Sequence, residues 1–88
     1  MSLREIVEAP NVKDDLGMYR RNYPEIDQIY DEAKLVLQDN PFEGDSIEEG
    51  SGFRRYLTPA TDNTPGFLIY YAYDIDHVYL HRIKKVVF

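Results

Sequence analysis

Six basic side chains in the last third of the chain are the residues best suited to chemistry on an anionic ligand. They form two groups, Arg54-Arg55 and His81-Arg82 with Lys84-Lys85. Arginine can hold a phosphate through two parallel hydrogen bonds. A histidine beside cations can act as a general acid, because its pKa lies near working pH. Each group also has a second interpretation: the arginines as surface charges that keep a sheet soluble, and His81 as a structural side chain.

Both basic groups lie in segments expected to be β-strands, roughly 53–58 and 77–87. Neighbouring strand residues point to opposite faces of a sheet. Arg54 and Arg55 are therefore expected on opposite faces, so that only one of them can join a given site. The same alternation places His81 and Lys85 on one face and Arg82 and Lys84 on the other.

Other chemistries find little support in the sequence. His77 and His81 are too far apart along a strand to share a metal ion, and no carboxylate pattern completes a site, so we expect no metal and no cofactor. The acidic segment 41–52 lacks the spacing of a calcium loop and is expected to be a mobile connection. Tyrosines could stack on unpaired bases, although packing across strands is favoured; these are Tyr70, Tyr71, Tyr73 and Tyr79.

Charge is divided unevenly along the 88 residues, which we expect to form one domain, 1–88. Residues 1–50 hold five Lys/Arg and thirteen Asp/Glu, a net of −8, and residues 51–88 hold five and three, a net of +2. The overall field disfavours nucleic acid, while the C-terminal part tolerates it locally. The chain has no cysteine and no apolar run long enough to span a membrane. We expect a soluble, cytoplasmic protein without disulfides.

The elements that must position the basic residues are indicated by periodicity and turn residues. We expect a strand at 3–9, helices at 12–21 and 25–39, and strands at 53–58, 66–73 and 77–87. Asn11 is the expected N-cap of the first helix, and Pro24 the expected first residue of the second. The predicted fold is α+β: two N-terminal helices packed on a mostly antiparallel four-stranded sheet. The predicted core is Ile26, Ile29, Ala33, Val36, Phe67, Ile69 and Leu80.

Four segments in this order carry a resemblance to a known family. They are Leu35-Val36-Leu37-Gln38-Asp39-Asn40-Pro41, Gly52-Phe53-Arg54-Arg55-Tyr56-Leu57, Gly66-Phe67-Leu68-Ile69-Tyr70-Tyr71 and Val78-Tyr79-Leu80-His81-Arg82-Ile83. The chain resembles the RelE/ParE superfamily of type II toxin–antitoxin toxins over roughly residues 5–85. The resemblance implies the order strand, two helices, three strands. It also implies a cognate antitoxin as partner.

The family resemblance implies either ribosome-dependent cleavage of messenger RNA, as in the RelE branch, or poisoning of gyrase, as in the ParE branch. For the first, the catalytic candidates are Arg54, His81 and Arg82, and the RNA-binding candidates are Arg55, Lys84 and Lys85. Tyr56 stands where a second lysine is often found, and Leu68 stands in place of the usual arginine. A leucine cannot hold a phosphate, so weak or no cleavage is expected. A non-catalytic binding protein of the same fold is the alternative.

Overall fold

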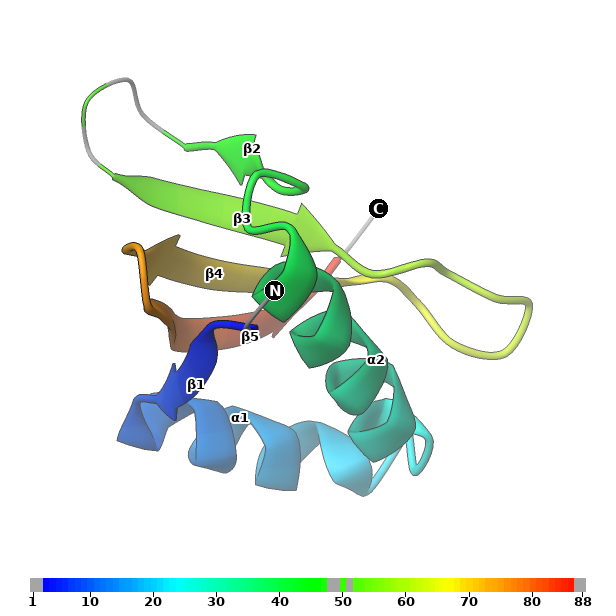
Figure 1. The fold of residues 1–88 in the computed structure, drawn as a ribbon. Helices are drawn as coiled ribbons and strands as arrows, with labels where there is room; N and C mark the ends of the chain where they lie inside the picture. The colour runs from blue at the N-terminus through cyan, green and yellow to red at the C-terminus, as the bar shows by residue number, and fades with distance from the viewer. Residues whose placement is uncertain (1–2, 48–49, 51, 87–88) are drawn as a thin grey trace.

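The fold is a five-stranded mixed sheet with two helices on one side (Figure 1), as seen in a computed structural model that describes residues 3–47, 50 and 52–86. The helices are α1 (Pro10–Arg20) and α2 (Ile26–Asp39). The strands are β1 (Glu5–Glu8), β2 (Asp45–Ser46), β3 (Phe53–Leu57), β4 (Phe67–Tyr73) and β5 (His77–Lys85). Their order in the sheet is β1-β5-β4-β3-β2. The predicted α+β class is confirmed.

The sheet has one strand more than the sequence predicted. Asp45 and Ser46, in the acidic segment that we expected to be only a connection, pair antiparallel with Arg55 and Arg54. β1 runs parallel to β5, and the other pairs of neighbours are antiparallel. A two-residue strand is too short to show a period, so the sequence pattern could not reveal β2.

Both helices begin at residues other than those predicted. α1 begins at Pro10, with Ala9 as its N-cap, so the expected cap at Asn11 is wrong. Proline suits the first helical position because its φ is already helical and its missing N–H has no partner there to lose. α2 begins at Ile26 after the cap residue Glu25, so Pro24 lies outside it. The end of α2 at Asp39 agrees with the predicted break at Asn40-Pro41.

The core lies between α2, α1 and the central strands. Five of the predicted core residues are buried, namely Ile26, Ala33, Phe67, Ile69 and Leu80. Ile29 and Val36 are only half-buried. The stripe of α2 that faces the core instead runs through Tyr30 and Leu37. Ile29 and Val36 lie beside that stripe.

Helix α1 covers the part of β5 that β1 does not reach. β1 pairs with β5 only as far as Leu80. Beyond it, the carboxylate of Asp15 accepts a hydrogen bond from the Ile83 N–H at 2.9 Å, and the Tyr19 hydroxyl accepts one from the Lys85 N–H at 3.0 Å. Asp15 and Tyr19 are one helical turn apart and so share a face. Two side chains thus take the place of a neighbouring strand.

A bulge in β5 corrects the predicted placement of its basic residues. Tyr71 pairs with Leu80 and Tyr70 with Arg82, which leaves His81 as an extra residue. Leu80 and Ile83 are consequently both buried on the helix side, although they are three residues apart. The prediction that His81 and Lys85 share a face is wrong, because the inserted residue reverses the alternation between them.

The acidic turn between β4 and β5 predicts a pH dependence of stability. The Asp74 carboxylate accepts hydrogen bonds from the Tyr79 hydroxyl at 2.7 Å and from the N–H groups of Asp76 and His77. These hydrogen bonds lower the pKa of Asp74 from 3.8 to about 2, and the bond from Tyr79 has the largest effect. A pKa lowered by folding stabilises the fold above pH 3.8, and that stabilisation is lost as the pH falls toward 2.

We therefore expect Asp74→Asn to lower the urea midpoint at neutral pH and to flatten its decline between pH 3.8 and about 2. The measurement is a series of urea unfolding curves across that range. Asp76→Asn, in the same exposed turn, is the matched control. Equal acid dependence in the parent and Asp74→Asn would show that the turn carboxylate does not carry this effect.

Gly44 lies where the segment after α2 passes beneath β3 and β4. The buried Tyr71 hydroxyl donates to the Pro41 carbonyl at 2.6 Å and accepts from the Gly44 N–H at 3.0 Å. A Cβ at Gly44 would lie 2.5 Å from both the Tyr71 hydroxyl and the Arg55 carbonyl oxygen. No side chain fits there without movement of the backbone.

Gly44→Ala should therefore destabilise the protein by about 1–3 kcal/mol. Gly17→Ala is the matched opposite case, because a Cβ in the middle of α1 would meet nothing within 4 Å. It should stabilise the protein by about 1 kcal/mol through helix propensity. Urea unfolding of both variants tests this pair, and a neutral Gly44→Ala would refute the close approach.

Candidate functional sites

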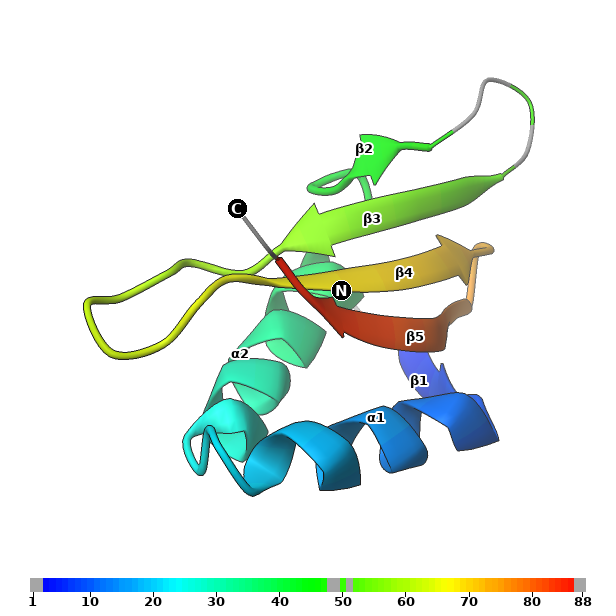
Figure 2. The same cartoon turned by 180° about the vertical axis from the view of Figure 1, so that it is seen from behind.

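The two faces of the sheet present different surfaces. α1 and α2 lie on one side, and Figure 2 shows the sheet from the other. We call that other side the open face. Pairing across β3, β4 and β5 places on it Phe53, Arg55, Leu57, Leu68, Tyr70, Ala72, Tyr79, Arg82 and Lys84. His81, the extra residue of the bulge, joins this face through its ring contact with Phe53. It combines cations with aromatic and aliphatic side chains.

Arg54 lies on the helix side and is part of the structure around Gly44. Its guanidinium donates to the Gly44 carbonyl at 2.7 and 3.0 Å and to the Phe42 carbonyl at 3.3 Å. It also lies over the Phe42 ring, 5.7 Å from the centroid. These contacts hold the segment between α2 and β2 against β3. Most of the hydrogen-bonding capacity that a phosphate would need is used within the protein.

Arg82 is held at the edge of the sheet by α1. Its guanidinium donates to the two carboxylate oxygens of Asp15 at 3.2 and 3.1 Å. Asp15 is 5% exposed, whereas the Arg82 side chain is 48% exposed. The hydrogen bond to Asp15 and its negative charge raise the pKa of Arg82 above the ordinary arginine value. Arg82 therefore neutralises a buried carboxylate that also holds the Ile83 N–H.

His81 lies in the bulge on the open face. Its ring meets that of Phe53 edge to face, with 5.1 Å between centroids. The three catalytic candidates thus lie in three places: Arg54 on the helix side of β3, His81 on the open face and Arg82 at the sheet edge. The structure does not bring them around one point.

The RNA-binding candidates are divided between the two faces. Arg55 and Lys84 lie on the open face, where Arg55 is opposite Tyr70 and Lys84 is opposite Leu68. Lys85 is on the helix side, with its ammonium 3.4 Å from the Tyr23 hydroxyl. Arg55 also has Asp45 opposite it in β2. The open face therefore holds the cations Arg55 and Lys84, together with the His81 ring beside Phe53.

The tyrosines show the same division. Tyr71 is buried and Tyr73 packs against the core from the helix side. Tyr70 and Tyr79 are half-buried on the open face, and the Tyr79 hydroxyl donates to Asp74. For Tyr71, packing is the observed role. Of these four tyrosines, Tyr70 and Tyr79 have their rings on the open face.

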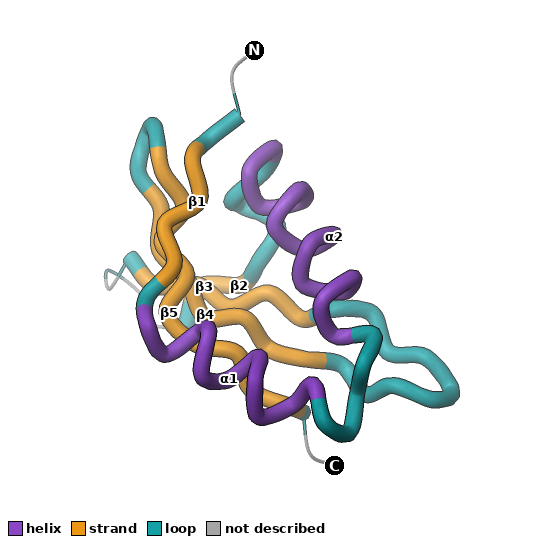
Figure 3. The backbone as a smooth tube through the Cα atoms, turned by 90° about the horizontal axis from the view of Figure 1, so that it is seen from below, coloured by secondary structure: helices purple, strands orange, loops and turns teal. Residues whose placement is uncertain are grey.

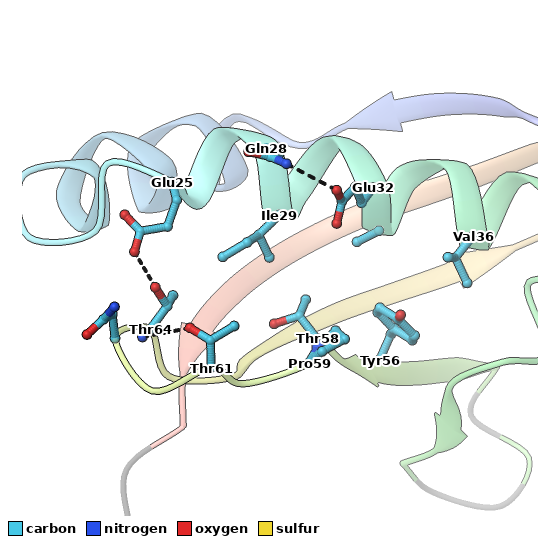
Figure 4. Close-up of a pocket in the computed structure, with 12 residues that line it drawn as sticks. Glu25, Gln28, Ile29, Glu32, Val36, Tyr56, Thr58, Pro59, Thr61 and Thr64 are labelled. Atoms are coloured by element: carbon cyan, nitrogen blue, oxygen red, sulfur yellow. Dashed lines mark hydrogen bonds between the residues drawn. The ribbon is translucent and has the colours of Figure 1, made fainter.

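A groove between α2 and β3 is a second candidate site, and sequence reasoning missed it. It has a volume of about 560 Å³. Figure 4 shows Ile29 and Val36 pointing from α2 toward Tyr56, Thr58 and Pro59 on the opposite wall. We call it the α2–β3 groove; its lining is Glu25, Gln28, Ile29, Glu32, Ala33, Val36, Tyr56, Thr58, Pro59, Thr61, Asn63 and Thr64. The sequence did carry one signal for this groove: the apolar stripe on α2 is wider than the part of it that the core buries.

The loop after β3 forms one wall of the groove and is braced by threonines. The Thr58 hydroxyl accepts from the Phe67 N–H at 2.8 Å, and the Thr61 hydroxyl accepts from the Thr64 N–H at 3.1 Å. Thr64 in turn donates to the Glu25 carboxylate at the start of α2 (Figure 4). The two walls are therefore joined at one end. Figure 3 shows this loop extending past the N-terminal end of α2.

Comparisons with known proteins give no relative for this chain: no family model, no curated protein and no solved structure matches it. Within the described residues, neither helix is long and apolar enough to cross a membrane. The same residues contain no group of three or more metal-binding side chains of His, Cys, Asp or Glu.

Proposed function

We propose that this chain is a RelE/ParE-like toxin-family protein of a toxin–antitoxin module, which acts by binding its target and has weak or no RNA cleavage of its own. The observation that carries the proposal is the order of elements. β1 precedes two helices, and β3, β4 and β5 then form an antiparallel meander. That is the order that the family resemblance implies. Because the proposed target is translation or gyrase, we propose that this chain acts in the cytoplasm.

The roles of the basic residues favour binding over cleavage. A transition state at a phosphate is stabilised by donors that are already aimed at it. Arg54 donates to the Gly44 and Phe42 carbonyls, and Arg82 is paired with Asp15. The two arginines therefore serve the fold. This favours the gyrase-directed or purely binding branch of the family resemblance.

Ribosome-dependent cleavage of messenger RNA is the second candidate function. The observation that favours it is the open face, where Arg55, Lys84 and His81 lie on the same side of the sheet as Tyr70. Such a face could hold an RNA backbone and stack a base. It lacks an arginine at position 68, the position that the resemblance gives to a phosphate ligand.

Co-expression with the product of the neighbouring reading frame tests the proposal. A toxin-family protein is expected to form a stable complex with a small antitoxin encoded there. The measurement is co-purification and then light scattering. A chain that purifies without a partner, whichever neighbouring product is supplied, would remove the main support for the toxin–antitoxin assignment.

A further inference from the structure

The α2–β3 groove presents apolar side chains that the protein itself covers only in part. Ile29 and Val36 are half-buried and extend from α2 into the groove toward the opposite wall. Tyr56 on that wall is also half-buried. The volume of about 560 Å³ lies within the range of ~300–1,000 Å³ typical of ligand sites. A concave site of this size, lined by apolar side chains with a few polar groups among them, favours binding of a ligand.

The charge around the groove is negative. Glu25 and Glu32 border it, and none of its twelve lining residues is Lys, Arg or His. The hydrogen bond from Thr64 lowers the pKa of Glu25, so its carboxylate remains ionised. On the opposite wall, burial first and then the charges of Glu43 and Glu32 raise the pKa of Tyr56.

The groove is long as well as acidic. Its lining on α2 runs from Glu25 to Val36, and at about 1.5 Å per residue this is roughly 16 Å. A peptide in extended conformation spans that length with about five residues. The dimensions therefore suit a short segment of chain.

We propose that the α2–β3 groove docks a short cationic segment of another protein. One or more apolar side chains of that segment enter between Ile29 and Tyr56, and Lys or Arg residues beside them pair with Glu25 and Glu32. Complementary charge favours such a partner over acidic ones and speeds its encounter. The inference goes beyond the proposed function, because it rests on the lining of the groove and not on the family resemblance.

Selection from a random peptide library on the folded protein tests this inference. Peptides of about twelve residues are more than twice the required span. The selected sequences are expected to carry a net positive charge and at least one large apolar residue. Their affinity should fall at least about tenfold in Ile29→Asp and in Glu32→Lys, and it should weaken with salt.

Two exposed positions on the same helix supply matched controls. Leu35, 60% exposed, lies outside the groove, so Leu35→Asp should bind the selected peptides as the parent does. Asp39→Lys makes the same charge change as Glu32→Lys at the end of α2 and should also leave binding unchanged. If Ile29→Asp fails to fold, methyl NMR of the parent with a selected peptide gives the answer, through shifts at Ile29 and Val36.

Several results would overturn the inference. They are the absence of any enriched peptide, enrichment of acidic peptides, or retained affinity in both groove variants. Self-association of the protein that Ile29→Asp abolishes would assign the groove to a second copy of this chain. Displacement of the peptide by a short RNA would assign it to nucleic acid. None of these depends on toxicity, so this inference and the proposed function can fail separately.

Discussion

The purified protein is expected to leave messenger RNA essentially uncut on translating ribosomes. Each well-placed donor at a transition state contributes about 10²–10³ in rate. Under the proposed family assignment two are missing here: Leu68 stands where the resemblance implies an arginine, and Arg54 is committed to the Gly44 carbonyl. Together these losses predict a rate lower by at least about 10⁴ than that of a complete site. The measurement is mapping of new 5′ ends on a translated message.

The two adjacent arginines supply a control for this result. Arg54 is on the helix side of the sheet and Arg55 is on the open face. Arg54→Ala and Arg55→Ala therefore each remove one positive charge, from opposite sides of the sheet. Robust cleavage by the parent that disappears in Arg54→Ala or His81→Ala, while both variants remain folded, would contradict the expectation of a protein without cleavage. It would restore the nuclease function.

Asp15→Ala should cause a large loss of stability, about 3 kcal/mol. Asp15 is 5% exposed, and its carboxylate accepts from the Ile83 N–H and from the Arg82 guanidinium. Alanine would leave a buried N–H without a partner, as well as an unpaired arginine. The measurement is the urea midpoint at a constant m-value, which separates stability from a change in compactness.

Three variants separate the contribution of the Ile83 N–H from that of the Arg82 ion pair. Arg82→Ala should destabilise the protein less than Asp15→Ala, because the Arg82 side chain is 48% exposed and the Ile83 N–H keeps its acceptor. Asp15→Asn keeps an acceptor for the Ile83 N–H and should lie between the two. Asp14→Ala, exposed on the same helix, should change stability by less than about 0.5 kcal/mol. A neutral Asp15→Ala would show that the edge of β5 does not need this carboxylate.

The α+β class, the two helices and the order of the longer strands along the chain could be predicted from the sequence. α2 is the clearest case, because its apolar residues recur at helical spacing. The two helix starts were misplaced because Pro10 and Pro24 offered competing positions for a first turn. The short pairing of Asp45–Ser46 depends on β3 being nearby, which is tertiary information.

The candidate sites were harder to predict than the fold. Side chains along β5 do not alternate strictly between the two faces of the sheet. The extra residue at His81 puts each later residue of the strand on the face opposite to the one predicted. The pairing of Arg82 with Asp15 joins residues 67 apart in sequence, and no local pattern reveals it. The α2–β3 groove could not be predicted for a different reason: Ile29 and Val36 match a core stripe, and only the orientation of α2 in the fold leaves them partly exposed.

Growth of cells on induced expression of this chain, with and without the neighbouring reading frame, tests the toxin assignment most directly. We predict that growth slows or stops without cleavage of messenger RNA. We also predict that co-expression of the neighbouring product restores growth. Gly17→Ala, expected to be folded and stable, should behave as the parent. Unimpaired growth while folded protein accumulates would contradict the central claim.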